Sequence, residues 1–279
     1  MRIQPSFSVE QIVVWDRNYD KPFLKETLQN ITQLTSEEYG EIEIVSSAKM
    51  EQGRAFAELI KGNIDVFIAS ADINRELQAN PIYVPLDRGL LGFRLCLVNK
   101  SARTFEHINT PSQFSQNNLS VGLGSHWPDR AVYEDNGFEV VTSPVYNSLF
   151  EMLKLKRFDC FSRSVNEIDS EIKRFKETAI IADPHIIFIY PNADFIYISP
   201  NNQNLHKRLS AGIGLAIEDN SYFDVFEKYY ESTLLKHGIY ERKLMIIKNQ
   251  QLSPAAFSAI NRFGIASFVR QPLETKPSN

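Results

Sequence analysis

The sequence predicts a two-lobed α/β protein in which two α/β lobes are joined by a two-stranded hinge. The first observation is an alternation of short apolar runs with amphipathic stretches of helical length, which is typical of parallel sheets covered by helices. The second is a similar helix–turn–strand segment in each half of that alternation. The third is the length of 279 residues, which suits two modest hydrophobic cores.

The first alternation lies near the start of the chain. Apolar runs predict strands at 12–15, 41–45 and 64–68, and apolar residues at helical spacing predict a helix in each interval. Pro22 suits the first turn of the first helix, and Gly62 suits the C-cap of the second. This order predicts parallel strands with right-handed crossover connections.

A second alternation begins near Leu119, with expected strands at 119–123, 138–141 and 157–162 and helices over 127–136 and around Leu149. Extended stretches flank this block on both sides. We therefore expect residues 98–189 to form lobe 2, and residues 1–97 and 190–279 to form lobe 1, with a C-terminal extension from about 238. The two crossings between the lobes would form the hinge.

Composition and charge exclude several classes of function. A net charge of −4 with no basic stripe argues against a nucleic-acid partner, and no apolar run has the length of a membrane span. Residues 1–5 lack the apolar middle of a secretory signal, so the chain fits either a cytoplasmic protein or one whose signal has been removed. With two cysteines and five histidines we expect no metal site and no cofactor.

The two cysteines lie in separate strand-like runs. We expect Cys96 and Cys160 to be buried free thiols, because no spacing suggests a pair. A disulfide between them is the alternative.

Three segments carry a resemblance to a known family. They are LIKGNIDV at 59–66, LKLKRFDCF at 153–161 and IEDNSYFDVFEKYY at 217–230. Together they make the chain similar, over about 11–238, to the polar amino-acid-binding family of extracytoplasmic solute-binding proteins. The resemblance implies a type II periplasmic-binding fold, a ligand held between the lobes, a periplasmic location and transporter subunits of the ABC type as partners.

Motifs for catalysis do not stand out. There is no nucleophile elbow, phosphate loop or metal motif, so we expect a monomeric binding protein and no enzyme. A ligand-sensing domain of the same fold is the alternative. A dehydratase-like enzyme using Asp16 and Asp72 is a further one.

Lobe 1 offers candidates in the loops that follow its first and third strands: Trp15, Asp16, Tyr19, Ser70 and Arg75. Aromatic rings suit a ligand cleft, although Trp15 equally suits the core. The resemblance implies an arginine that donates two parallel hydrogen bonds to a ligand carboxylate. Arg75 is the nearest match, and Arg88 and Arg94 are the next candidates. Arg75 equally fits the solvated surface, and Arg88 equally fits a pair with Asp87.

Lobe 2 offers the turn Gly124, Ser125, His126 and Trp127, between a strand and a helix. Free backbone N–H groups at a helix start favour an anion. The resemblance implies that Gly124 and Ser125 meet a ligand carboxylate. Gly124 equally serves to shape the turn, and Ser125 equally serves to cap the helix.

The strand at 158–164 departs from the family's pattern at a position that contacts the ligand. The resemblance implies an acid that grips an ammonium group at the position of Ser164, where this chain has serine preceded by Arg163. If Arg163 lines the cleft, it favours an anionic or uncharged polar ligand. The alternative pairs Arg163 with Glu167, one helical turn on.

Overall fold

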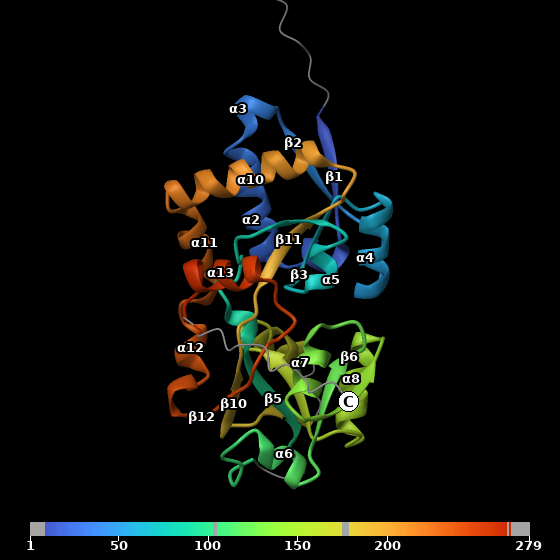
Figure 1. The fold of residues 1–279 in the computed structure, drawn as a ribbon, viewed down its shortest axis with the longest axis vertical. Coiled ribbons are helices and arrows are strands. Elements are labelled where there is room, and N and C mark those ends of the chain that lie inside the picture. Colours follow the sequence, from blue (N-terminus) through green and yellow to red (C-terminus); the bar gives the residue numbers. More distant parts are fainter. Residues whose placement is uncertain (1–8, 103–104, 175–178, 267, 269–279) are drawn as a thin grey trace, which may run out of the picture. The chain divides into compact units, whose positions relative to one another are not determined.

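The computed structural model describes residues 9–102, 105–174, 179–266 and 268. The chain divides into two compact units (Figure 1). Unit 1 comprises Met1–Ala69, Asn74–Leu86 and Phe195–Glu231; unit 2 comprises Ser70–Ile73, Asp87–Asp194 and Ser232–Asn279. Residues 1–5 lie outside these ranges, as do residues 267 and 269–279 of the predicted C-terminal extension. No helix in these ranges combines the length and apolarity needed to cross a bilayer.

Unit 1 is built on a five-stranded sheet in the order β2-β1-β3-β11-β4. β1 is parallel to both β2 and β3, whereas β11 and β4 are antiparallel. The strands are β1 (Glu10–Val14), β2 (Ile42–Ser46), β3 (Val66–Ser70), β4 (Asn80–Ile82) and β11 (Asp194–Ile198). The predicted parallel arrangement of the first three strands is therefore confirmed.

Helices of unit 1 start and stop where the sequence indicates. Pro22 occupies the first turn of α2, and Gly62 ends α4 in a left-handed conformation with a φ of 82°. The Asn202 side chain caps α10 by accepting a hydrogen bond from the Leu205 N–H. The helices are α1 (Asp16–Tyr19), α2 (Pro22–Gln33), α3 (Ser36–Tyr39), α4 (Gln52–Lys61), α5 (Ile73–Glu76), α10 (Gln203–Glu218) and α11 (Ser221–Tyr230).

Unit 2 is built on a seven-stranded sheet in the order β12-β10-β5-β8-β6-β7, with β9 also paired to β5. β6 is parallel to β7 and β8, and β5 is antiparallel to β8, β9 and β10. The strands are β5 (Phe93–Asn99), β6 (Ser120–Gly124), β7 (Glu139–Ser143), β8 (Cys160–Ser164), β9 (Ile180–Ala182), β10 (Ile186–Ile189) and β12 (Lys243–Ile246).

Short helices connect these strands. The helices are α6 (Ser112–Gln116), α7 (Asp129–Asp135), α8 (Tyr146–Lys154), α9 (Ile168–Arg174), α12 (Thr233–Lys236) and α13 (Pro254–Phe263), with 3-10 turns at Leu90–Gly92 and Ile239–Glu241. α7 and α8 pack on β6 and β7, so they complete the predicted second α/β block.

The limits of the units differ from the predicted lobes. The predicted boundary at residue 97 falls inside β5, which belongs as a whole to the sheet of unit 2. The segment from Ser232 onward, assigned by sequence to lobe 1, also belongs to unit 2, because β12 pairs in parallel with β10. The chain thus passes between the units at 69–70, 73–74 and 231–232 as well as at 86–87 and 194–195.

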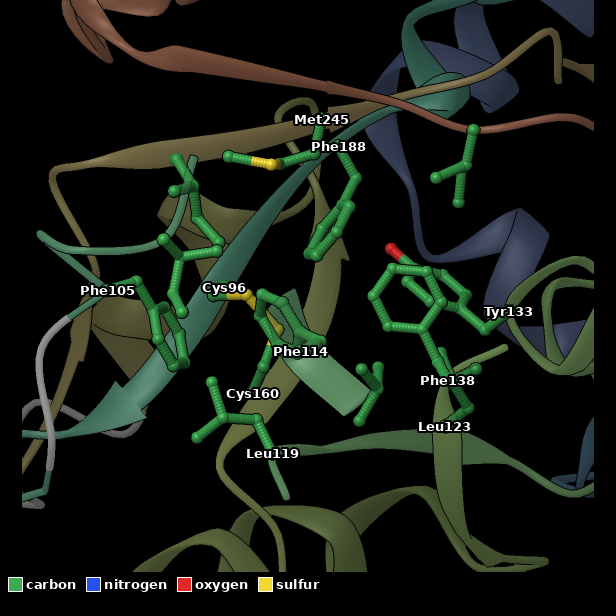
Figure 2. Close-up of a cluster of buried hydrophobic side chains, with 14 of the residues drawn as sticks. Cys96, Phe105, Phe114, Leu119, Leu123, Tyr133, Phe138, Cys160, Phe188 and Met245 are labelled. Atoms are coloured by element: carbon green, nitrogen blue, oxygen red, sulfur yellow. A yellow bond between two sulfur atoms is a disulfide. The ribbon is translucent and has the colours of Figure 1, made fainter. Parts of the chain in front are cut away.

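The core of unit 2 contains a disulfide between Cys96 and Cys160, which corrects the expectation of free thiols (Figure 2). Cys96 lies opposite Ser162 in the β5–β8 ladder, so Cys160 is a diagonal neighbour on the same face. Both sulfurs lie among buried aromatic residues, including Phe114 and Phe188. A separation of 64 residues hides this proximity from the sequence.

We expect reduction of this disulfide to destabilise the protein. It closes a loop of 64 residues, so chain entropy in the unfolded state accounts for about 4 kcal/mol. Urea unfolding with and without reductant should show a lower midpoint for the reduced protein. A Cys96→Ala, Cys160→Ala variant should be insensitive to reductant, and equal midpoints for the reduced and oxidised natural chain would contradict the disulfide.

Candidate ligand-binding site

The loop after β1 is anchored in unit 1. Trp15 is 5% exposed, its ring centroid lies 5.1 Å from that of Phe67, and its Nε1 donates to the Met50 carbonyl at 3.1 Å. Asp16 accepts from the Met50 N–H at 3.2 Å, and its own N–H donates to Ser47 Oγ. Trp15 is therefore a core residue. One carboxylate oxygen of Asp16 binds Met50, in the loop that follows β2.

Tyr19, the last residue of α1, is half-buried next to Lys25. The Lys25 Nζ donates to the Tyr19 hydroxyl at 3.1 Å and lies 4.2 Å from its ring centroid. The ammonium group therefore covers the ring by a cation–π contact.

The segment after β3 places Arg75 inside unit 1. Arg75 is 7% exposed, and its Nη2 donates to Gln52 Oε1 at 3.4 Å. Its guanidinium carbon lies 5.6 Å from the Phe67 ring centroid and 5.9 Å from that of Phe56. The solvated-surface interpretation of Arg75 is therefore wrong. Ser70, at the end of β3, is also buried.

Arg88 and Asp87 hold a turn at the start of unit 2. Arg88 has a φ of 49°, and its Nε donates to the Phe263 carbonyl at 3.0 Å, so the side chain binds the end of α13. The Asp87 carboxylate accepts hydrogen bonds from the N–H groups of Gly89, Leu91 and Asp194. Asp87 therefore ties together the two segments at 87 and 194 where the chain enters and leaves unit 2.

Arg94 lies inside unit 2 and is 1% exposed. It donates to Ser162 Oγ at 3.3 Å, to the Ser162 carbonyl at 3.1 Å and to the Leu91 carbonyl at 3.3 Å. Its Nη2 also lies 3.6 Å from the Asp129 carboxylate. This guanidinium therefore stabilises the β5–β8 pair from within.

The turn between β6 and α7 presents candidates to solvent. His126 is exposed, while Ser125 and Trp127 are half-buried. The Ser125 N–H donates to the Ser143 carbonyl at 3.0 Å, and the Trp127 N–H donates to the Gly124 carbonyl at 3.0 Å. Pro128 occupies the N-cap position of α7, so Ser125 is not the cap of this helix. The Ser125 hydroxyl therefore stays a candidate for ligand binding.

Glycine is required at 124 by the tryptophan ring. A Cβ on Gly124 would lie 2.5 Å from Cε2 of Trp127. The same ring is stacked near Phe161, with centroids 6.2 Å apart and planes 12° apart. Gly124 therefore shapes the turn by letting the Trp127 ring lie flat over the end of β6.

Arg163 is buried and paired with two carboxylates. Its Nε donates to both carboxylate oxygens of Glu171, at 2.8 and 3.0 Å, and its Nη2 donates to Glu167 Oε2 at 2.8 Å. Burial opposes the charge of Arg163, but these carboxylates more than offset it and hold its pKa well above the ordinary value. The pairing with Glu167, proposed from sequence as the alternative, is thus present. The Ser164 hydroxyl donates to the Leu90 carbonyl at 2.9 Å.

The structure brings some candidates together within each unit. Trp15 and Arg75 both contact Phe67 in unit 1. Trp127 and Arg163 contact each other in unit 2, with the guanidinium carbon 4.6 Å from the ring centroid. Ser164 is directed to the other face of β8, because successive strand residues alternate.

Two partners of Arg163 were not predicted from the sequence. Glu171 follows Glu167 by one helical turn, which is a usable signal once α9 is placed. Tyr146 comes from the start of α8, and its hydroxyl donates to Glu171 Oε1 at 2.5 Å. No pattern in the sequence links Tyr146 to Arg163. Within the described ranges, no three His, Cys, Asp or Glu side chains are grouped to hold a metal ion.

Comparison with known proteins defines the fold. No protein-family model and no curated protein matches the chain. Among solved structures, an ancestral arginine-binding protein bound to glutamine is 13% identical, with a TM-score of 0.61 over 80% of this chain and 99% of that one. The arginine-, lysine-, histidine-binding protein ArtJ from Geobacillus stearothermophilus is 11% identical, with a TM-score of 0.58 over 80% and 95%.

A histidine kinase sensor domain with similarity to periplasmic binding proteins is 14% identical, with a TM-score of 0.55 over 79% of this chain and 96% of that one. The neighbours are consistently periplasmic amino-acid-binding proteins and their structural relatives. The chain therefore has the two-lobed periplasmic-binding-protein fold, as predicted, in a divergent sequence.

Substitution of Gly124 should displace the Trp127 ring. In Gly124→Ala the new methyl group would collide with the indole, and overpacking of this kind costs about 1–3 kcal/mol. We expect a lower unfolding midpoint and an altered tryptophan fluorescence spectrum. Gly214→Ala is the matched control, because Gly214 lies in α10 with open space around it. A Gly124→Ala protein as stable as the natural one would contradict this geometry.

The stability of the protein should depend on the protonation of Asp87. Burial, together with the nearby Asp194 charge, raises the pKa of Asp87 to about 8. An unfolded aspartate titrates near pH ~4, so the folded state binds more protons than the unfolded state from about pH 4 to about pH 8. The free energy of unfolding should therefore fall as the pH rises through this interval.

The check compares the natural protein with Asp87→Asn. Urea unfolding at several pH values should give a weaker pH dependence in the variant, because asparagine does not titrate. Only the difference in slope counts, since the amide also changes the hydrogen bonds of the turn. Parallel slopes in the two proteins would show that Asp87 titrates normally.

Proposed function

We propose that the protein is an extracytoplasmic solute-binding protein that clamps a small polar ligand between its two lobes and delivers it to an ABC-type transporter, without enzymatic chemistry. The main support is the fold shared with binding proteins over 80% of the chain. Ligands of open α/β sheets bind at the carboxyl ends of strands. The turn Ser125–Trp127 follows the carboxyl end of β6 and has an exposed histidine beside a half-buried hydroxyl and ring.

The ligand site is proposed to use the loops predicted from sequence. These are the loop that begins at Trp15, the segment from Ser70 to Arg75, the turn at Ser125–Trp127 and the end of β8 at Arg163 and Ser164. Among the candidates named for these loops, those that are not buried are Tyr19, Ser125, His126 and Trp127.

The ligand is proposed to be amino-acid-like. The sequence-based case for an anionic ligand needs the charge of Arg163, and that charge is paired with Glu167 and Glu171. A guanidinium with two carboxylate partners attracts a further anion weakly, because the cluster as a whole carries excess negative charge. Solved neighbours include proteins described as binding arginine or glutamine.

The Cys96–Cys160 disulfide supports an extracytoplasmic location. Disulfides persist in oxidising compartments such as the periplasm and are rare in the cytosol. This agrees with the periplasmic character of the solved neighbours.

A ligand-sensing domain is the second candidate function. One solved neighbour is a histidine kinase sensor domain of the same fold. Carrier and sensor share the clamping step, so they differ in the partner alone. Co-purification with a membrane permease supports the carrier, whereas co-purification with a signalling kinase supports the sensor.

A thermal-shift screen tests the proposed binding. Amino acids, di-acids, phosphates, amines and short peptides should include one class that raises the melting temperature, because a ligand that binds only the folded state stabilises it by mass action. At 100 times its Kd the ligand adds about 2.7 kcal/mol. A screen in which nothing raises the melting temperature would overturn the proposal.

Variants then test the site. Ser125→Ala and His126→Ala should weaken binding of the hit, measured by calorimetry, with little change in the stability of the free protein because these side chains are not in the core. Ser112→Ala, at an exposed position at the start of α6, is the control and should bind normally. Unchanged affinity in both test variants would remove the β6–α7 turn from the site.

A further inference from the structure

Five side chains of unit 2 surround the guanidinium of Arg163. We call them the Arg163 cage, and they come from the β6–α7 turn, α8, β8 and the start of α9: Trp127, Tyr146, Phe161, Glu167 and Glu171. All belong to unit 2.

Aromatic rings form one part of the cage. The guanidinium carbon lies 4.6 Å from the Trp127 ring centroid, 5.2 Å from that of Phe161 and 5.5 Å from that of Tyr146. A cation within about 6 Å of a ring face is attracted by the ring quadrupole, and the attraction grows when water is excluded. Arg163 is 4% exposed, so water is largely excluded here.

Carboxylates form the other part. Both carboxylate oxygens of Glu171 accept a hydrogen bond from Nε, and Glu171 Oε1 also lies 2.6 Å from Nη2. Nη2 donates a further hydrogen bond to Glu167 Oε2. The Tyr146 hydroxyl fixes the Glu171 carboxylate at the same time. Planar, bidentate contacts of this kind select a guanidinium over a spherical cation.

We propose that this cage is a receptor for an organic cation, and that Arg163 is its resident guest and thereby a specificity-determining residue. Aromatic rings with carboxylates are the chemistry that recognises alkylguanidinium and alkylammonium groups. With the guest supplied by the chain itself, the cage is closed to cations from solution. If the protein is a solute-binding protein, as proposed above, a cationic ligand group cannot enter the cage while Arg163 occupies it.

The test empties the cage. Arg163→Ala removes the side chain beyond Cβ, a fragment that corresponds to ethylguanidinium. Ethylguanidinium chloride at about 10 mM should raise the melting temperature of Arg163→Ala by about 3 °C, given mass action and the size of the chain. It should leave the natural protein unshifted, and its affinity for the variant should be at least about tenfold higher by calorimetry, a difference equivalent to 1.4 kcal/mol.

Two controls separate recognition of a cation from the filling of a hole. Ethylurea has the same shape without the charge, so it should not stabilise Arg163→Ala. The double variant Arg163→Ala, Glu171→Gln keeps the cavity but loses the bidentate carboxylate, so it should lose the response to ethylguanidinium. Equal shifts with ethylurea and ethylguanidinium, or no shift with either, would overturn the proposal.

The experiment remains decisive if Arg163→Ala folds poorly. In that case the measured quantity is the refolding yield in each solute, and ethylguanidinium should raise it where ethylurea and sodium chloride do not. Equal yields in the three solutes would count against the cage. Because no physiological ligand is used, this outcome is independent of whether the protein serves a transporter.

Discussion

The antiparallel pairing of β5 with β8 is the constraint on which the candidate site of unit 2 depends. The disulfide joins the two strands on one face, and Arg94 bonds Ser162 from β5. With the register fixed in this way, Arg163 is directed to the opposite face, toward Trp127. A shift of one residue would exchange these faces and place the arginine in the apolar core.

The two buried arginines of the unit 2 sheet both have partners. Arg163 is held by carboxylates and rings, and Arg94 by carbonyls and by Asp129. A buried charge without such partners costs several kcal/mol. Removing one partner of such a pair should therefore lower the free energy of unfolding more than removing both. Such pairs hold their segments firmly, which suits them to support the turns near the proposed ligand.

The sequence predicts the fold well because strand and helix periodicity are local. The strands β1–β3 and β6–β8, and the main helices between them, follow from apolar spacing and from residues such as Pro22 and Gly62. The long-range contacts could not be predicted in this way. The Cys96–Cys160 bond, the Tyr146–Glu171 contact and the pairing of β12 with β10 join residues that no periodicity relates. The burial of Arg75 against Phe67 could not be predicted for the same reason.

The proposed function rests on one ligand engaging loops of both units. Hydrogen–deuterium exchange of the full chain, with and without the hit from the ligand screen, tests this directly. The account predicts slower exchange on binding in residues 15–19 of unit 1 and also in the turn at 124–127 of unit 2. Protection confined to one of the two regions, or absent from both, would contradict a clamp.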